Sequence, residues 1–254
     1  MYSRPHLANG PLLWDRFESR ILEIVSYALI MMRTAPTLPE DERDLNQLLG
    51  RYIRDALWAL RASDTGLDQM PHLDAGNQPD MDDPEPSARE DMRPDFQWEL
   101  KDVQARNREE YQRFYALECK RLGFRTSPGW VLNKQYVTNG IKRFVKREYA
   151  YGSPKSNASA AMIGYVQTME LNQILDEVNS FCKTNSVRQI DLSGGWRKDI
   201  SFLAHLLDRP EVHSTPLLLQ HLWIDLRDVP VVPLEKNKTG TKKRSSRTRG
   251  ARKM

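Results

Sequence analysis

Three charged side chains in the middle of the chain have the types and spacing of a hydrolytic metal site. Glu118 and Lys120 lie in the run F-Y-A-L-E-C-K-R-L at residues 114–122, whose apolar first half predicts a buried β-strand. Side chains of a strand alternate between its faces, so Glu118 and Lys120 share one face. Asp95 follows a proline in a second strand-like run, residues 93–99, at a separation that suits a hairpin. The two strands are therefore expected to bring all three side chains to one point.

Two carboxylates and an amine at one point suit the hydrolysis of a phosphodiester. Asp95 and Glu118 offer the oxygen ligands that Mg²⁺ or Mn²⁺ prefers, and such an ion polarises the phosphoryl group and activates water. Lys120 would position or deprotonate that water, or stabilise charge on the pentacovalent phosphate. Charges at alternate positions of a strand more often form a solvated face. Here the apolar residues before Glu118 indicate burial, and a buried charge needs a partner such as an ion or a substrate.

The motif Pro94-Asp95 followed by Glu118-Cys119-Lys120 resembles that of the PD-(D/E)xK nuclease superfamily. The resemblance implies the restriction-endonuclease-like fold, an α/β architecture in which helices flank a mixed central sheet. It also implies Mg²⁺ or Mn²⁺ as the cofactor and DNA as the substrate. In that reading Asp95 and Glu118 bind the metal and Lys120 is catalytic.

Members of that superfamily often take a further acidic residue from a helix that precedes the core strands. Glu42 is the candidate here, and Glu18 or Glu23 could serve instead. The run Y-V-x-N-G-I-x-R-F at residues 136–144, together with residues 162–166, also resembles a pattern in bacterial nuclease-like proteins of defence and mobile-element loci. This second resemblance implies a role against foreign DNA.

A helix expected at residues 133–148 alternates apolar and basic positions. If the apolar positions pack on the sheet, Lys142, Arg143 and Lys146 face outward, where they can bind a phosphate backbone. The alternative is an ordinary solvated helix face. With a core strand at residues 160–166, the order becomes strand, strand, helix, strand, which the resembled fold requires.

The remaining pattern divides the chain into four parts. Residues 1–62 form a helical N-terminal region, with helices expected at 11–33 and 40–62 from their apolar spacing. Residues 63–93 read as an acidic flexible loop, and residues 94–234 as the nuclease core. Within that core we also expect helices at 169–184 and 196–207, and strands at 187–192 and 217–226. Residues 235–254 form a basic tail that we expect to be disordered in isolation.

Composition narrows the class of protein. From Lys236 onward the tail carries nine Lys and Arg and no acid, so residues 1–235 have a net charge of −5 within a total of +4. Such a polycation binds phosphate backbones without sequence preference. Two cysteines, Cys119 and Cys182, favour neither a disulfide framework nor a zinc site. His205, His213 and His221 fit no metal spacing. The absence of a signal peptide or a long apolar run predicts a cytoplasmic protein.

Two functions from different classes remain open at the level of sequence. The first is a metal-dependent nuclease that acts on DNA, or alternatively on RNA, and depends on a homodimer or a partner protein for target selection. The second is a non-catalytic nucleic-acid-binding or assembly subunit that keeps a nuclease-like fold. Retention of Asp95, Glu118 and Lys120 together favours the nuclease.

Overall fold

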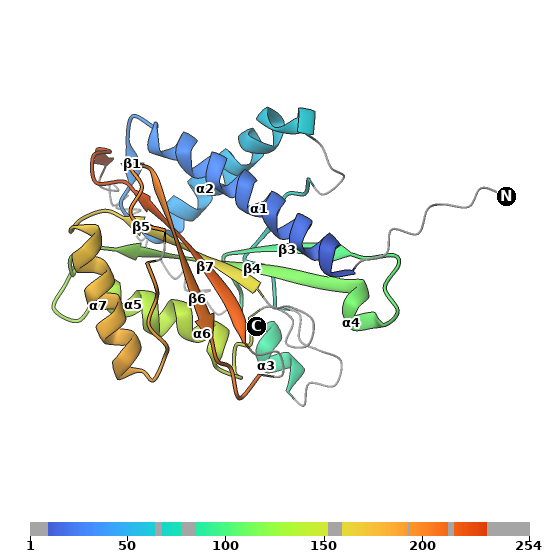
Figure 1. Cartoon of the computed structure of the whole chain (residues 1–254). Coiled ribbons are helices and arrows are strands. Elements are labelled where there is room, and N and C mark those ends of the chain that lie inside the picture. The colour runs from blue at the N-terminus through green and yellow to red at the C-terminus, as the bar shows by residue number, and fades with distance from the viewer. Residues whose placement is uncertain are drawn as a thin grey trace, which may run out of the picture.

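A six-stranded mixed sheet forms the centre of the molecule (Figure 1). The computed structural model describes residues 10–63, 68–77, 85–151, 159–192, 194–212 and 216–232. The sheet order is β2-β3-β4-β5-β7-β6. Its strands are β2 (His72–Leu73), β3 (Phe96–Lys101), β4 (Gln112–Leu122), β5 (Ser159–Val166), β6 (Ile200–Leu207) and β7 (Leu217–Asp225). The pairs β2–β3, β3–β4 and β6–β7 are antiparallel, whereas β4–β5 and β5–β7 are parallel.

Helices cover both faces of this sheet, so the expected architecture of a mixed sheet between helices is confirmed (Figure 1). One face carries α1 (Gly10–Arg33) and α2 (Glu42–Ala59), and the other carries α5 (Leu132–Tyr136) and α7 (Leu171–Thr184). Two separate apolar clusters fill the two layers. The shorter elements are η1 (Arg61–Ser63), α3 (Pro86–Glu90), α4 (Arg108–Tyr111), and a two-stranded parallel pair of β1 (Leu38–Pro39) with β8 (Val231–Val232).

Strand β4 divides its side chains between the two layers as its alternation predicts. Leu117 and Cys119 pack in the cluster under α1 and α2, whereas Ala116 and Leu122 pack in the cluster under α5 and α7. Glu118 and Lys120 alternate with Leu117 and Cys119, so they belong to the second face. The core order β3, β4, helix, β5 also follows the expectation.

Three of the expected elements differ in the structure. Residues 133–148 are not one helix, because α5 continues into a π-helical turn, η2 (Val137–Ile141), and then into α6 (Lys142–Val145), which ends at Val145. The expected helix at 196–207 is wrong, since Ile200–Leu207 is strand β6 paired along its length with β7. The expected strand at 187–192 is also wrong, because only an isolated bridge between Asp191 and Ala204 forms there.

The segment expected as a flexible acidic loop, residues 63–93, contributes structure in its described part. His72 and Leu73 form the edge strand β2 on β3, and α3 follows at Pro86–Glu90. The buried Asn77 donates from Nδ2 to the carbonyl of Tyr149 at 2.7 Å. Residues 64–67 and 78–84 lie outside the described residues, as do His213 and the basic tail at 235–254.

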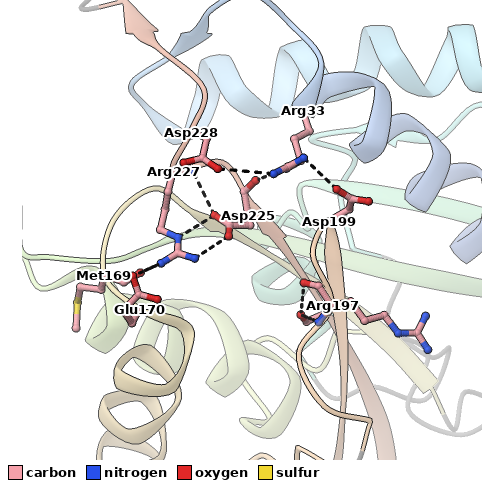
Figure 2. Close-up of polar contacts among 9 residues, drawn as sticks. Arg33, Met169, Glu170, Arg197, Asp199, Asp225, Arg227 and Asp228 are labelled. Carbon is pink, nitrogen blue, oxygen red and sulfur yellow. Dashed lines mark hydrogen bonds and ion pairs between the residues drawn. The ribbon is translucent and has the colours of Figure 1, made fainter.

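An ion-pair network fastens the C-terminal end of α1 to the ends of β6 and β7 (Figure 2). Arg33 donates from Nε to the carbonyl oxygen of Asp225 at 2.8 Å and pairs with Asp199 at 2.9 Å. Arg227 holds the Asp225 carboxylate at 2.8 Å and reaches Glu170, the residue before α7, at 2.6 Å. These contacts join both helical layers to the same end of the sheet. Among the described residues, no helix is long and apolar enough to cross a membrane.

Candidate functional site

The site lies at a fork where strand β3 leaves strand β4. The two strands pair from Lys101↔Gln112 to Phe96↔Leu117, and β4 then continues to Leu122 beside β5 alone. Asp95 stands just before β3, and its Oδ2 accepts the backbone N–H of Cys119 at 2.7 Å. A side-chain carboxylate thus satisfies a backbone donor just beyond the last residue pair of the ladder. This bond fixes Asp95 beside Glu118 and Lys120.

The ammonium of Lys120 occupies the centre of the fork. Its Nζ lies 2.8 Å from Glu118 Oε1, 2.7 Å from Glu42 Oε1 and 3.9 Å from Asp95 Oδ2. It also donates to the carbonyl oxygen of Cys119 at 2.7 Å. The structure therefore brings the predicted Asp95, Glu118, Lys120 and Glu42 together, although they come from three separate segments of the chain.

Glu42 reaches the fork because it is the first residue of α2. Asp41 caps this helix, its Oδ1 accepting the backbone N–H of Asp44 at 2.9 Å, which fixes the direction in which α2 starts. The second oxygen of Glu42 accepts the backbone N–H of Arg121 at 3.3 Å. The two alternative acids lie elsewhere: Glu18 accepts a hydrogen bond from Gln220, and Glu23 pairs with Arg20.

A second cation, Arg143, completes the site from the opposite side. Its Nη1 lies 2.5 Å from Glu118 Oε1, the same oxygen that Lys120 contacts. Arg143 belongs to α6, directly after the π-helical turn, and such turns often occur at functional sites. Gly140 in that turn lets the helix approach the sheet, because a Cβ there would clash with Met162 Cε and would lie 3.3 Å from Lys120 Cγ.

Burial shifts the pKa values of the acids and of the lysine in the site. Complete burial raises the pKa of the Glu118 carboxyl from 4.5 to about 8, although Lys120 and Arg143 favour its ionised form. Burial likewise raises the pKa of Asp95, against the influence of Lys120 and of the Cys119 N–H. For Lys120, burial lowers the pKa, but Glu118, Asp95 and Glu42 outweigh it, so the pKa lies above its ordinary value. Lys120 therefore stays protonated at neutral pH.

The acids of the site supply carboxylate oxygens, the ligands that a hard divalent cation prefers. Glu118 has a fully buried side chain, and its Oε2 has no hydrogen-bond partner among the described residues. A buried carboxylate oxygen without a partner is costly, and a cation would satisfy it. Asp95, Glu118 and Glu42 are three acids facing two cations, which leaves room for further positive charge. Among the described residues, no group of three or more His, Cys, Asp or Glu is placed so that it could hold a metal ion, and Lys120 lies among these acids instead.

The three basic residues predicted to bind nucleic acid have different environments. Arg143 is turned into the site, where it pairs with Glu118. Lys142 donates to Asn185 Oδ1 at 3.2 Å, and Lys146 forms an exposed pair with Glu148 at 2.7 Å. Sequence reasoning missed the contact of Arg143 with Glu118. A glycine inside a helical run, Gly140, was the available signal, because such a glycine often marks close packing.

Comparisons of the chain with protein-family models, with curated proteins and with solved structures found no match. What the site can do is therefore argued from its own residues. The arrangement offers the buried carboxyl of Glu118, the partly buried carboxyl of Asp95, a protonated amine and a guanidinium around one point, with an acid from α2 at its edge.

Proposed function

We propose that this protein is a metal-dependent phosphodiester hydrolase of the restriction-endonuclease-like fold that cleaves DNA. The observation that carries the proposal is the buried Glu118, whose Oε2 is left without a partner at a strand fork that also holds Asp95 and Lys120. A carboxylate buried without full pairing destabilises the fold, which functional sites tolerate and ordinary packing avoids. The non-catalytic alternative gives no reason to retain such a group.

Asp95 and Glu118 would hold Mg²⁺ or Mn²⁺, with Glu42 as a further acid at the edge of the site. The bound ion would polarise the phosphoryl group and lower the pKa of the attacking water. Hydrolysis forms a bond from the water oxygen to phosphorus and breaks the bond from phosphorus to the sugar oxygen. The leaving oxygen takes up a proton, so the products are a phosphate monoester and a hydroxyl.

Lys120 contributes charge rather than basicity. Its pKa lies above the ordinary value because of the surrounding acids, and a protonated amine has donors but no acceptor. It can therefore orient water through its N–H groups and stabilise negative charge that develops on the phosphoryl oxygens. Of the roles considered from sequence, removal of a proton from water is the one that this environment disfavours.

The choice of DNA, of a cellular role and of partners follows the resemblance of the motif. We place this role against foreign DNA in the cytoplasm, with a homodimer or a partner protein for target selection. The proposed catalytic site and the basic tail of the chain agree with this role. Lys142 and Lys146 would add contacts to the phosphate backbone, because phosphate contacts position a protein on nucleic acid without reading sequence.

Calorimetric titration of the protein with Mn²⁺ tests the proposal without relying on turnover. One ion site is expected in the wild type, and Asp95→Asn or Glu118→Gln should weaken it at least about tenfold by removing an oxygen ligand. Glu99→Gln is the matched control, since Glu99 lies on β3 but bonds with Gln112 and Lys101 outside the fork. Equal Mn²⁺ affinity in all four proteins would favour the non-catalytic nucleic-acid-binding subunit.

A further inference from the structure

Glu118 and Arg143 form an incomplete ion pair. Arg143 uses Nη1 alone, and Glu118 uses Oε1 alone, although a guanidinium and a carboxylate can pair through two parallel hydrogen bonds. The remaining atoms include Glu118 Oε2 and Arg143 Nε, both buried and without a hydrogen-bond partner among the described residues. One unpaired atom is an acceptor and the other is a donor.

The two unpaired atoms call for ligands of opposite charge. Glu118 Oε2 would be satisfied by a cation, and Arg143 Nε by an anion with oxygen acceptors, for which phosphate is the usual partner of arginine. A divalent ion and a phosphodiester arriving together would supply both. In their absence the two side chains contact one another through Oε1 and Nη1 alone.

The surroundings of Arg143 allow such a change of partner. Its side chain is 28% exposed, whereas that of Glu118 is fully buried, so the arginine is the member of the pair that can turn toward a ligand. The ring centroids of Tyr149 and Tyr151 lie 5.8 and 6.0 Å from its guanidinium carbon, so both rings flank the guanidinium. The short helix α6 begins where the π-helical turn ends, which fixes the backbone of Arg143 near the sheet.

We propose that Arg143 couples ion binding to substrate binding, holding Glu118 in the free protein and passing to the phosphate of the nucleic acid when a divalent ion takes Glu118. This inference rests on the proposed function and assigns Arg143 as a positioning residue of that site. It distinguishes Arg143 from its neighbours Lys142 and Lys146, which pair with Asn185 and Glu148 and not with Glu118. Ion and DNA then strengthen one another's binding, and by linkage the two effects are equal.

Titrations with Ca²⁺, with and without a mixed-sequence DNA duplex, test the coupling. Ca²⁺ has the same preference for oxygen ligands as Mg²⁺, and gel analysis would verify that the duplex stays intact. All titrations are made at the same pH. The variants are Arg143→Gln and Arg143→Lys. Lys101→Gln is the control, since it removes one positive charge, which pairs with Glu99 outside the fork.

DNA should lower the Kd for Ca²⁺ in the wild type by a factor about ten times larger than in Arg143→Gln. A factor of this size is expected when one close charge contact is exchanged for another. Arg143→Gln should bind Ca²⁺ at least as tightly as the wild type without DNA, because the competing cation is gone. Lys101→Gln should match the wild type within about twofold, and Arg143→Lys should lie between the wild type and Arg143→Gln.

Two results would contradict the proposal, and they are distinguishable. If Arg143→Gln keeps the full effect of DNA on Ca²⁺ binding, the arginine does not couple the two ligands, and the proposed function is untouched. If the wild type binds no Ca²⁺, with or without DNA, the proposed function fails and this inference fails with it. Thermal denaturation of each variant would verify that it is folded.

Discussion

Replacing Glu118 by glutamine should change how stability depends on pH. Burial raises the pKa of this carboxyl from 4.5 to about 8 in the folded protein. Between these two values the folded chain keeps a proton that the unfolded chain releases, so the free energy of unfolding falls as the pH rises. The amide of the Glu118→Gln variant would resemble the protonated acid at every pH, so the variant would lack this fall.

The size of the effect follows from the shift. One pKa unit corresponds to about 1.4 kcal/mol, so the wild type should lose on the order of 5 kcal/mol, relative to Glu118→Gln, between about pH 4.5 and pH 8. Urea denaturation in the presence of a chelator, at several values across this range, measures the difference. The control is Glu99→Gln, which changes a partly buried acid of the neighbouring strand. Parallel stability curves for wild type and Glu118→Gln would refute the reasoning, because they would show that Lys120 and Arg143 keep Glu118 ionised.

Three further predictions concern the structure around the site. Gly140→Ala should lower the free energy of unfolding by about 1–3 kcal/mol in urea denaturation, because the added Cβ clashes with Met162 Cε; unchanged stability would show that Met162 moves aside freely. Burial lowers the pKa of His205 to about 4 in the folded protein. The free energy of unfolding of the wild type should therefore fall by about 3 kcal/mol as the pH falls from 6.5 to 4, and His205→Gln should lack this fall. Arg227→Gln should lower the melting temperature by an amount equivalent to about 1–2 kcal/mol, since it removes the guanidinium donors from the Asp225 carboxylate and leaves it only the backbone N–H of residue 227 (Figure 2); an unchanged melting temperature would show that water replaces the guanidinium.

The centre of the site could be predicted from sequence because strand geometry is local. Once residues 114–122 are assigned to a strand, the alternation of side chains places Glu118 and Lys120 on one face. The hairpin that brings Asp95 to them needs only two strands and a connection between them. Glu42 could be proposed because the resembled superfamily often takes an acid from a helix before the core strands, although its contact with Lys120 depends on the packing of α2.

The remaining features depend on contacts that sequence patterns do not encode. The contact of Arg143 with Glu118 depends on the π-helical turn, which alters the direction of every side chain after Ile141. The residues of β6 are apolar at positions that fit a helix as well as a strand, and their pairing with β7 decides between the two. His205 and His221 lie on these paired strands, and their rings stack in the core with centroids 5.5 Å apart.

Cleavage of supercoiled plasmid DNA tests the central claim most directly. The wild type, Glu118→Gln, Asp95→Asn and the control Glu99→Gln would be incubated with Mg²⁺, with Mn²⁺ and with a chelator. We expect nicked or linear product from the wild type and from Glu99→Gln in the presence of metal alone, and a loss of at least about a hundredfold in both site variants. Cleavage that persists in the chelator, or that is equal in the folded Glu118→Gln variant, would contradict the assignment of this fork as a metal-dependent nuclease site.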